Sequence, residues 1–317
     1  MRLRPFGRRR ESEDSPGGDS PTPFIVGVNR SGTTLLRMML DAHPEMAIPP
    51  ETHFIPDLKQ FVAGGGATPE STVAFLVSQP RWDDFGLDPG ELLARLAGRR
   101  VRTKRVLKAF FGLYAEKRGK RRWGDKTPGY VKQMGLVQRV LPQAHFIHLI
   151  RDGRDVAISR EGRQLREPLS VGRLARIWKR RISRARRQSR RLDHYMEVRY
   201  EDLVARPEAT LRQVCDFIEL EYDPAMLDYH VHAGERLEEI ARDLPTGDGV
   251  RPAAERLEAH SLVNEPPRVE RAGRWHELMS PEEVAEFEAV AGDLLADLGY
   301  ERAARETPGA ADGAASR

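Results

Sequence analysis

Residues 24–34 read FIVGVNRSGTT, and this stretch decides the fold. The apolar run at its start, Phe24–Val28, is short and is typical of a strand buried inside a sheet. A turn follows, and from Thr33 to His43 the apolar residues recur on one helical stripe. The turn has the spacing G-x-x-x-x-G between a strand and a helix, which is the context that a phosphate-binding loop requires.

This loop offers an anion many hydrogen-bond donors. Backbone N–H groups of such a turn, and the helix N-terminus after it, point at a bound phosphate. Arg30 adds a guanidinium that can grip two oxygens, Ser31, Thr33 and Thr34 add hydroxyls, and Gly32 lets the backbone turn. Thr33 stands where a nucleotide triphosphatase has lysine, which argues against hydrolysis of ATP or GTP. A capping turn without a ligand would need fewer donors than these.

A second candidate anion site follows the strongest strand pattern of the chain, His145–Ile150. Arg151 comes directly after it, and open α/β sheets bind ligands beyond the carboxyl ends of their strands. Ser159 and Arg163 are four residues apart on the next predicted helix, so they share a face. The three side chains together would hold one phosphate. The alternative is that both arginines only pair with neighbouring acidic side chains.

Strands and helices alternate along the rest of the chain, which predicts an α/β fold. We expect a P-loop-type three-layer sandwich with a mainly parallel central sheet and a helical insertion at about 58–120. A single domain would span 23–302, and the polar ends, 1–22 and 303–317, are expected to be disordered. The further elements expected are strands at 46–48 and 196–200, helices at 88–98, 101–118, 131–141, 154–163, 170–193, 207–220 and 281–298, and a long loop at 244–270.

The composition fits a soluble globular protein. The 317 residues are 39% apolar and 32% charged, and the net charge of +4 suits anionic ligands without identifying nucleic acid. Cys215 is the single cysteine, so no intramolecular disulfide can form. The N-terminus lacks an apolar signal region, and no stretch approaches the roughly 20 apolar residues of a membrane span. We therefore expect a cytoplasmic protein without a transmembrane segment.

Two other features bear on partners. Residues 173–191 are rich in arginine around an apolar stripe, which indicates a helix packed on the core with a basic outer face. That face is either simply solvated or a surface for an acidic substrate, a membrane or nucleic acid. The histidines do not cluster with acidic residues or with Cys215 at ligand spacing, so no metal site is predicted.

At the loop, residues 30–34 and the LLRMMLDAHPE that follows them resemble the 5′-phosphosulfate loop of sulfotransferases that use PAPS (3′-phosphoadenosine 5′-phosphosulfate). The likeness is closer to the tyrosylprotein sulfotransferases and their bacterial relatives, and it extends with gaps from Phe24 to Tyr300. The resemblance implies that the spacing of Arg151, Ser159 and Arg163 serves the 3′-phosphate. It further implies three cofactor contacts: Tyr200 near the adenine, Arg274 in a closing loop at 271–275, and Ser261 facing the cofactor.

The resemblance also implies the chemistry, an in-line displacement in which an acceptor oxygen attacks sulfur and the bridging phosphate oxygen leaves. Glu51, in the sequence PPETHF, matches the glutamate that serves as base in this branch, and His53 is its rival. Lys126 and Arg30 would stabilise charge on the leaving group. The transferring group carries one negative charge, so no metal is needed to neutralise it.

Two other functions remain open from the residues alone. One is a P-loop kinase-like phosphotransferase that uses ATP, and the other is a non-catalytic protein that binds anions or nucleic acid. Nucleic acid is the less expected ligand of the enzyme. The sequence does not identify the acceptor, which could be a hydroxyl of a small molecule, carbohydrate, lipid or peptide, and it does not indicate an oligomeric state.

Overall fold

The structure is a computed structural model that describes residues 20–161, 169–247 and 249–303. Within these residues, four parallel strands form the central sheet in the order β4-β1-β5-β6. Two smaller sheets accompany it, a parallel pair β2-β3 and an antiparallel pair β7-β8. The strand bounds are β1 Thr22–Gly27, β2 Met46–Ala47, β3 Arg122–Trp123, β4 Asp125–Lys126, β5 Ala144–Ile150, β6 Tyr195–Arg199, β7 Leu244–Thr246 and β8 Gly249–Arg251.

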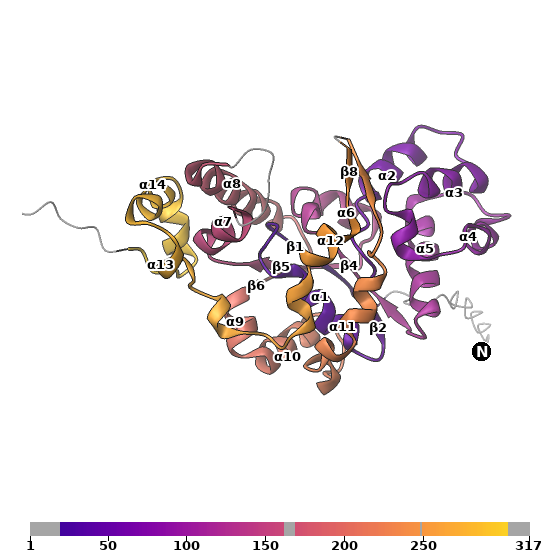
Figure 1. The fold of residues 1–317 in the computed structure, drawn as a ribbon. Coiled ribbons are helices and arrows are strands. Elements are labelled where there is room, and N and C mark those ends of the chain that lie inside the picture. Colours follow the sequence, from indigo (N-terminus) through magenta and orange to yellow (C-terminus); the bar gives the residue numbers. More distant parts are fainter. Residues whose placement is uncertain (1–19, 162–168, 248, 304–317) are drawn as a thin grey trace, which may run out of the picture.

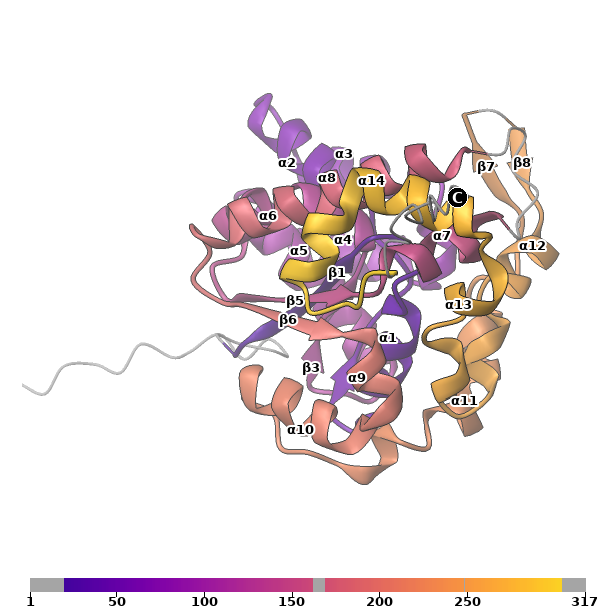
Figure 2. The ribbon, with the colours of Figure 1, turned by 90° about the vertical axis from the view of Figure 1, so that its left-hand side faces the viewer.

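Helices cover both faces of the central sheet, which makes the predicted three layers (Figure 2). Side chains alternate between the faces of a strand, so Ile25 and Ile147 pack with α1 and α10, whereas Phe24 and Phe146 pack on the opposite face with α6. The helix bounds here are α1 Thr33–Ala42, α6 Met134–Val140, α7 Gly153–Glu161, α8 Val171–Ser189, α9 Tyr200–Ala205, α10 Pro207–Phe217, α11 Tyr229–Glu238, α12 Ala253–Glu258, α13 Trp275–Leu278 and α14 Pro281–Asp297.

The predicted insertion is helical and forms the violet end of the molecule in Figure 1. It begins slightly earlier than expected, at Ile55, and its core is aromatic: the ring of Phe110 lies 5.1 Å from that of Phe54 and 4.9 Å from that of Phe85. Edge-to-face packing of such rings stabilises these helices, and α5 also packs on the β2-β3 pair through the stacked rings of Phe111 and Trp123. Its elements are α2 Ile55–Ala63, α3 Pro69–Val77, the 3₁₀ turn η1 Trp82–Phe85, α4 Pro89–Leu96 and α5 Thr103–Lys117.

Several expected boundaries need correction. The segment 244–270 is not one long loop, because it contains β7, β8, α12 and two 3₁₀ turns, η4 Ser261–Asn264 and η5 Val269–Arg271. Thr22 already belongs to β1, and Tyr200 begins α9 instead of ending a strand. Ala303 is held by a hydrogen bond from its N–H to Glu288. The other residues expected to be disordered, 1–19 and 304–317, lie outside the described residues.

The described part of the chain contains no helix long and apolar enough to cross a bilayer. The arginine-rich helix is α8, whose apolar stripe packs on α7 and α14. Part of its basic face is paired within the protein: Lys179 bonds to Asp293 of α14, and Arg186 bonds to Glu197 of β6. The helix therefore helps to hold the C-terminal elements against the sheet.

Candidate active site

The predicted phosphate-binding loop, residues 27–34, lies between the end of β1 and the start of α1, as the sequence predicts, and is here called the phosphate-type loop. Arg30 and Gly32 both have positive φ angles, 79° and 90°. At Gly32 a side chain has no room, because a Cβ would lie 2.4 Å from a ring carbon of Tyr200. The backbone of the turn therefore approaches the aromatic ring as only glycine allows.

Arg30 connects this loop to two other parts of the site. Its Nε donates to the Ser159 hydroxyl of α7 at 2.9 Å, and its Nη1 donates to the carbonyl of Ala259 at 3.1 Å. The hydroxyl of Ser31 is buried and has no hydrogen-bond partner among the described residues. A buried hydroxyl without a partner costs free energy, so it is suited to a ligand that supplies one.

Two of the three residues predicted for the second anion site, Arg151 and Ser159, line the same cleft. Arg151 follows β5 and is only 9% exposed, and its guanidinium lies 4.4 Å above the ring of Tyr200. Its Nη1 lies 3.4 Å from the carbonyl of Arg30, while its Nε is buried without a partner in the ranges that the structure describes. Ser159 is linked to Arg151 indirectly: its hydroxyl accepts a hydrogen bond from Arg30, and the carbonyl of Arg30 lies near Arg151. The predicted third member, Arg163, lies outside the described residues.

Lys126 and Glu51 meet at the carboxyl end of β4. The strand pairs with β1, in register Ile25 to Lys126, so Lys126 lies next to the phosphate-type loop. Its ammonium donates to a carboxylate oxygen of Glu51 at 2.6 Å and to the Thr34 hydroxyl at 3.5 Å. The other oxygen of Glu51 lies 2.8 Å from the ring nitrogen of His53. The two candidate bases, Glu51 and His53, are thus hydrogen-bonded to each other.

A buried polar cluster fixes the segment that carries Glu51. The Thr52 hydroxyl donates to Asp125 at 2.7 Å, and the Thr52 N–H donates to the Thr127 hydroxyl at 3.0 Å. Burial raises the pKa of Asp125 to about 6, against hydrogen bonds from Thr52 and Thr127 that lower it. These bonds attach residues 51–53 to β4, so Glu51 and Lys126 are placed by the same element.

The electrostatics favour an ionised glutamate. Burial alone would raise the pKa of Glu51, but the Lys126 ammonium and the contact with His53 outweigh it and hold the pKa well below its usual value. Burial lowers the pKa of Lys126, and Glu51 opposes that change. The side chain of Lys126 is 3% exposed and that of Glu51 is 21% exposed, so the carboxylate is the partner that an incoming molecule can reach.

His260 is a site residue that the sequence reasoning missed. Its Nδ1 lies 3.3 Å from the Thr34 hydroxyl, which Lys126 also approaches. Burial, with the charge of Lys126, lowers the pKa of His260 to about 3, so its imidazole is neutral near pH 7. The predicted neighbour Ser261 is exposed and donates to the carbonyl of Glu258 at 3.0 Å. Ser261 does not line the cleft that His260 lines, and its contact with the cofactor stays a prediction.

These groups line one cleft of about 1040 Å³. The insertion contributes Arg81, η5 contributes Arg271, and the segment after η5 contributes the predicted Arg274. The sequence contained no local signal for Arg81, which enters through the tertiary packing of the insertion. No group of three or more metal-ligating side chains gathers within the ranges that the structure describes. The predicted residues that line the cleft are Arg30, Gly32, Thr33, Thr34, Glu51, Lys126, Arg151, Ser159, Tyr200 and Arg274, with His53 beside them.

Comparison with known proteins identifies the family. The model of the sulfotransferase family matches residues 21–224. Protein-tyrosine sulfotransferase 1 of Danio rerio is 27% identical over 293 residues, which cover 89% of this chain and 73% of that protein. Nodulation protein NoeE of Sinorhizobium fredii is 28% identical over 311 residues, which cover 89% of this chain and 67% of that protein.

Solved structures agree on the fold. The sulfotransferase domain from the curacin biosynthetic pathway superposes with a TM-score of 0.59 at 22% identity, covering 90% of this chain and 99% of that one. The sulfotransferase domain of the Synechococcus PCC 7002 olefin synthase gives 0.55 at 23% identity. The ATP-dependent and the non-catalytic alternatives are not favoured by these matches. The chain belongs to the sulfotransferase family, and its activity is sulfonate transfer.

Proposed function

We propose that the protein transfers the sulfonate group of PAPS to a hydroxyl of an acceptor. The observation that carries this proposal is the position of Lys126, whose ammonium reaches Glu51 at 2.6 Å and Thr34 of the phosphate-type loop at 3.5 Å. A candidate base and a candidate anion site therefore meet at one cation. This is the arrangement that an in-line transfer between a bound donor and an acceptor needs.

The residues present fit the two phosphate positions of PAPS. The Ser31 hydroxyl and the Arg151 Nε are both buried without a partner in the part of the chain that the structure describes. The Ser31 hydroxyl belongs to the first predicted anion site and the Arg151 Nε to the second. An anion bound at each site could therefore accept a hydrogen bond from a donor that now lacks one. Gly32 keeps the loop backbone free of a side chain, and Tyr200 offers an aromatic ring beside it.

PAPS would supply a sulfonate activated by its link to the 5′-phosphate. Residues 30–34 would hold that 5′ side, Arg151 and Ser159 would hold the 3′-phosphate, and Tyr200 and Arg274 would flank the nucleoside. Lys126 and Arg30 would stabilise the negative charge that develops on the leaving oxygen. We expect no requirement for a metal, because the sulfonate carries one negative charge and these two cations face it.

Glu51 would take the proton of the acceptor hydroxyl. Its carboxylate is ionised at neutral pH and lies at the open side of the Lys126 pair. The ion pair also makes Glu51 a weak base in the free protein. When the ammonium of Lys126 turns to the donor's oxygens, Glu51 loses that partner and its basicity rises. Donor binding would therefore prepare the base for the acceptor.

The acceptor is proposed only as a class, a hydroxyl of a small molecule, carbohydrate, lipid or peptide. The Danio rerio relative is named for protein tyrosine and the Sinorhizobium relative for nodulation. These names differ, so they do not select one acceptor for this chain.

Calorimetric binding tests the donor. Adenosine 3′,5′-bisphosphate is titrated without Mg²⁺, and ATP is titrated with Mg²⁺, into wild type and into Arg151→Ala. We expect micromolar binding of the bisphosphate, at least tenfold weaker in Arg151→Ala, and no comparable binding of ATP. Arg212→Ala is the matched control, because that arginine is exposed on α10 and pairs with Glu208. Binding of ATP with Mg²⁺ but not of the bisphosphate would refute the proposal.

A further inference from the structure

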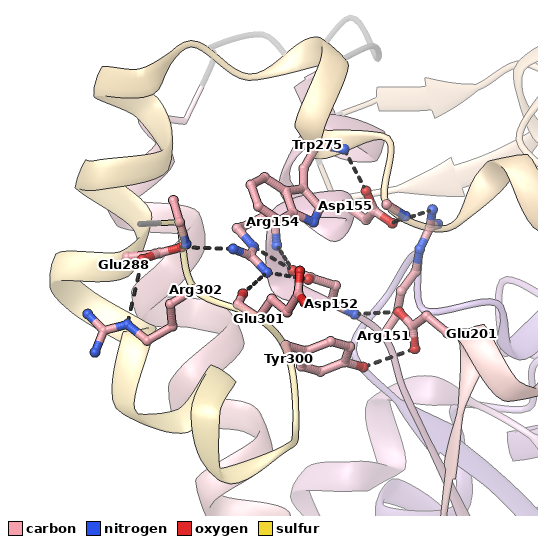
Figure 3. A network of polar contacts seen from close by, with 12 residues as sticks. Arg151, Asp152, Arg154, Asp155, Glu201, Trp275, Glu288, Tyr300, Glu301 and Arg302 are labelled. Carbon is pink, nitrogen blue, oxygen red and sulfur yellow. Dashed lines mark hydrogen bonds and ion pairs between the residues drawn. The ribbon is translucent and has the colours of Figure 1, made fainter. Parts of the chain in front are cut away.

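Asp155 lies buried between the cleft and the C-terminal elements (Figure 3). It stands in the first turn of α7, and its side chain has no solvent exposure. One carboxylate oxygen accepts the backbone N–H of Trp275 at 3.0 Å, and the other accepts that of Gly273 at 2.9 Å. The second oxygen also lies 3.4 Å from the Nη2 of Arg151. One carboxylate thus joins a backbone loop to an arginine of the cleft.

The loop that Asp155 holds, residues 271–275, is here called the closing loop. Two of its side chains, Arg271 and Arg274, line the cleft. Its centre, Gly273, has a φ of 78°, a conformation that glycine adopts without strain. Arg151 also donates to the carbonyl of Arg271. The same guanidinium therefore contacts both Asp155 and the loop that Asp155 holds.

A second buried residue, Arg154, fixes the far side of the closing loop. It is 1% exposed and forms ion pairs with Asp152 at 2.7 Å and with Glu288 of α14 at 2.8 Å. Its guanidinium carbon lies 3.5 Å from the centre of the Trp275 ring. Arg154 thus anchors the loop to α14, whereas Asp155 anchors it to the cleft (Figure 3).

We propose that Asp155 is a positioning residue for the donor nucleotide. Its carboxylate holds Arg151 and the closing loop in one arrangement, so that guanidinium groups from both meet the 3′-phosphate together. The Asp155 carboxylate also places a negative charge near the positive charges of Arg151, Arg271 and Arg274, which would otherwise repel one another. This inference rests on the proposed function and adds to it a residue that does not itself touch the donor.

The test is Asp155→Asn, which keeps the size of the side chain and removes its charge. The N–H groups of Gly273 and Trp275 approach different oxygens of Asp155, so in the amide one of them would face an NH2 donor instead of an acceptor. We expect the Kd for adenosine 3′,5′-bisphosphate to rise about 10- to 100-fold, since a hydrogen bond to a charged group is lost. The KM for PAPS should rise similarly while kcat changes little. Trypsin should cleave faster after Arg271 or Arg274.

Asp41→Asn is the matched control. Asp41 is also a buried carboxylate that accepts a backbone N–H and pairs with an arginine, but its partners are Ile48 and Arg236 and not the closing loop. We expect a lower melting temperature with bisphosphate affinity close to that of wild type. An equal loss of affinity in Asp41→Asn would show that general destabilisation explains the effect, and it would overturn the proposal.

The outcomes separate the two proposals. If wild type does not bind the bisphosphate, the proposed function fails and the role of Asp155 fails with it. If wild type binds and Asp155→Asn binds equally well, only the role of Asp155 fails. Should Asp155→Asn not fold, hydrogen exchange of wild type gives a second measurement. The amides of Gly273 and Trp275 should exchange slowly, and more slowly with the bisphosphate, whereas fast exchange of both would overturn the inference.

Discussion

Replacement of Glu51 by glutamine separates the chemical step from donor binding. The glutamine cannot take a proton, and loss of a general base lowers rates by about 10²- to 10⁴-fold, or roughly 3 to 5 kcal/mol in the activation barrier. The amide oxygen of the glutamine can still accept a hydrogen bond from Lys126. The Lys126 side chain is only 3% exposed, so its ammonium would be buried without an opposite charge, and we expect the free energy of unfolding to fall by about 1 to 2 kcal/mol.

The assay follows bisphosphate release from PAPS with an acceptor found by screening hydroxyl compounds. The kcat of Glu51→Gln should fall by the stated factor, while the Kd for adenosine 3′,5′-bisphosphate stays the same or improves, because Lys126 loses a competing carboxylate. His53→Gln is the matched control, since it leaves the carboxylate in place, and its kcat should fall less than tenfold. The reasoning is refuted if Glu51→Gln keeps more than a tenth of the activity, or if His53→Gln loses as much as Glu51→Gln.

Three further predictions concern the same cleft. Gly32→Ala should abolish bisphosphate binding in calorimetry and lower the melting temperature, because its Cβ would lie 2.4 Å from the Tyr200 ring at a φ of 90°. The kcat/KM for PAPS, which reports ionisation in the free enzyme, should stay level as the pH falls from 8 to about 5 and fall below the ordinary carboxyl range, because the pKa of Glu51 is depressed in the free protein and the base must be unprotonated. Lys126→Met should move this fall in kcat/KM to higher pH, because it removes the cation that lowers the pKa of Glu51. If kcat/KM of wild type instead falls near pH 6.5, the ordinary pKa of imidazole being about 6.5, a histidine base would be favoured. His260→Ala should lower kcat by about tenfold, since it removes one of the two partners of the Thr34 hydroxyl. Ser261→Ala should leave kcat and bisphosphate affinity unchanged, and the reverse order would contradict the structure.

The parts of the site that the sequence predicts well are local ones. The strand, turn and helix of residues 24–43 are consecutive, so periodicity and glycine spacing identify them together. Arg151 follows from the same logic, since it stands at the end of a strongly apolar strand. Lys126 does not, because β4 has two residues and its pairing with β1 is a tertiary event. Only family resemblance indicated that residue.

The segment 244–270 shows what local pattern cannot reveal. Its prolines, glycines and charges favour a loop, yet it forms a hairpin and α12. Arg256 of α12 forms a buried ion pair with Asp84 of the insertion, and the two residues are 172 positions apart in the chain. A contact between such distant segments has no sequence signature. It also sets the register that brings His260, and not Ser261, to the loop.

The most direct test of the central claim is transfer itself. The protein is incubated with PAPS, a chelator and a mixture of hydroxyl compounds, and the products are measured by mass spectrometry beside Lys126→Met and Arg151→Ala. The account predicts that wild type adds one sulfonate to at least one hydroxyl compound and forms an equal amount of adenosine 3′,5′-bisphosphate, while both variants form far less. Transfer from ATP in place of PAPS, or undiminished transfer in both variants, would contradict it.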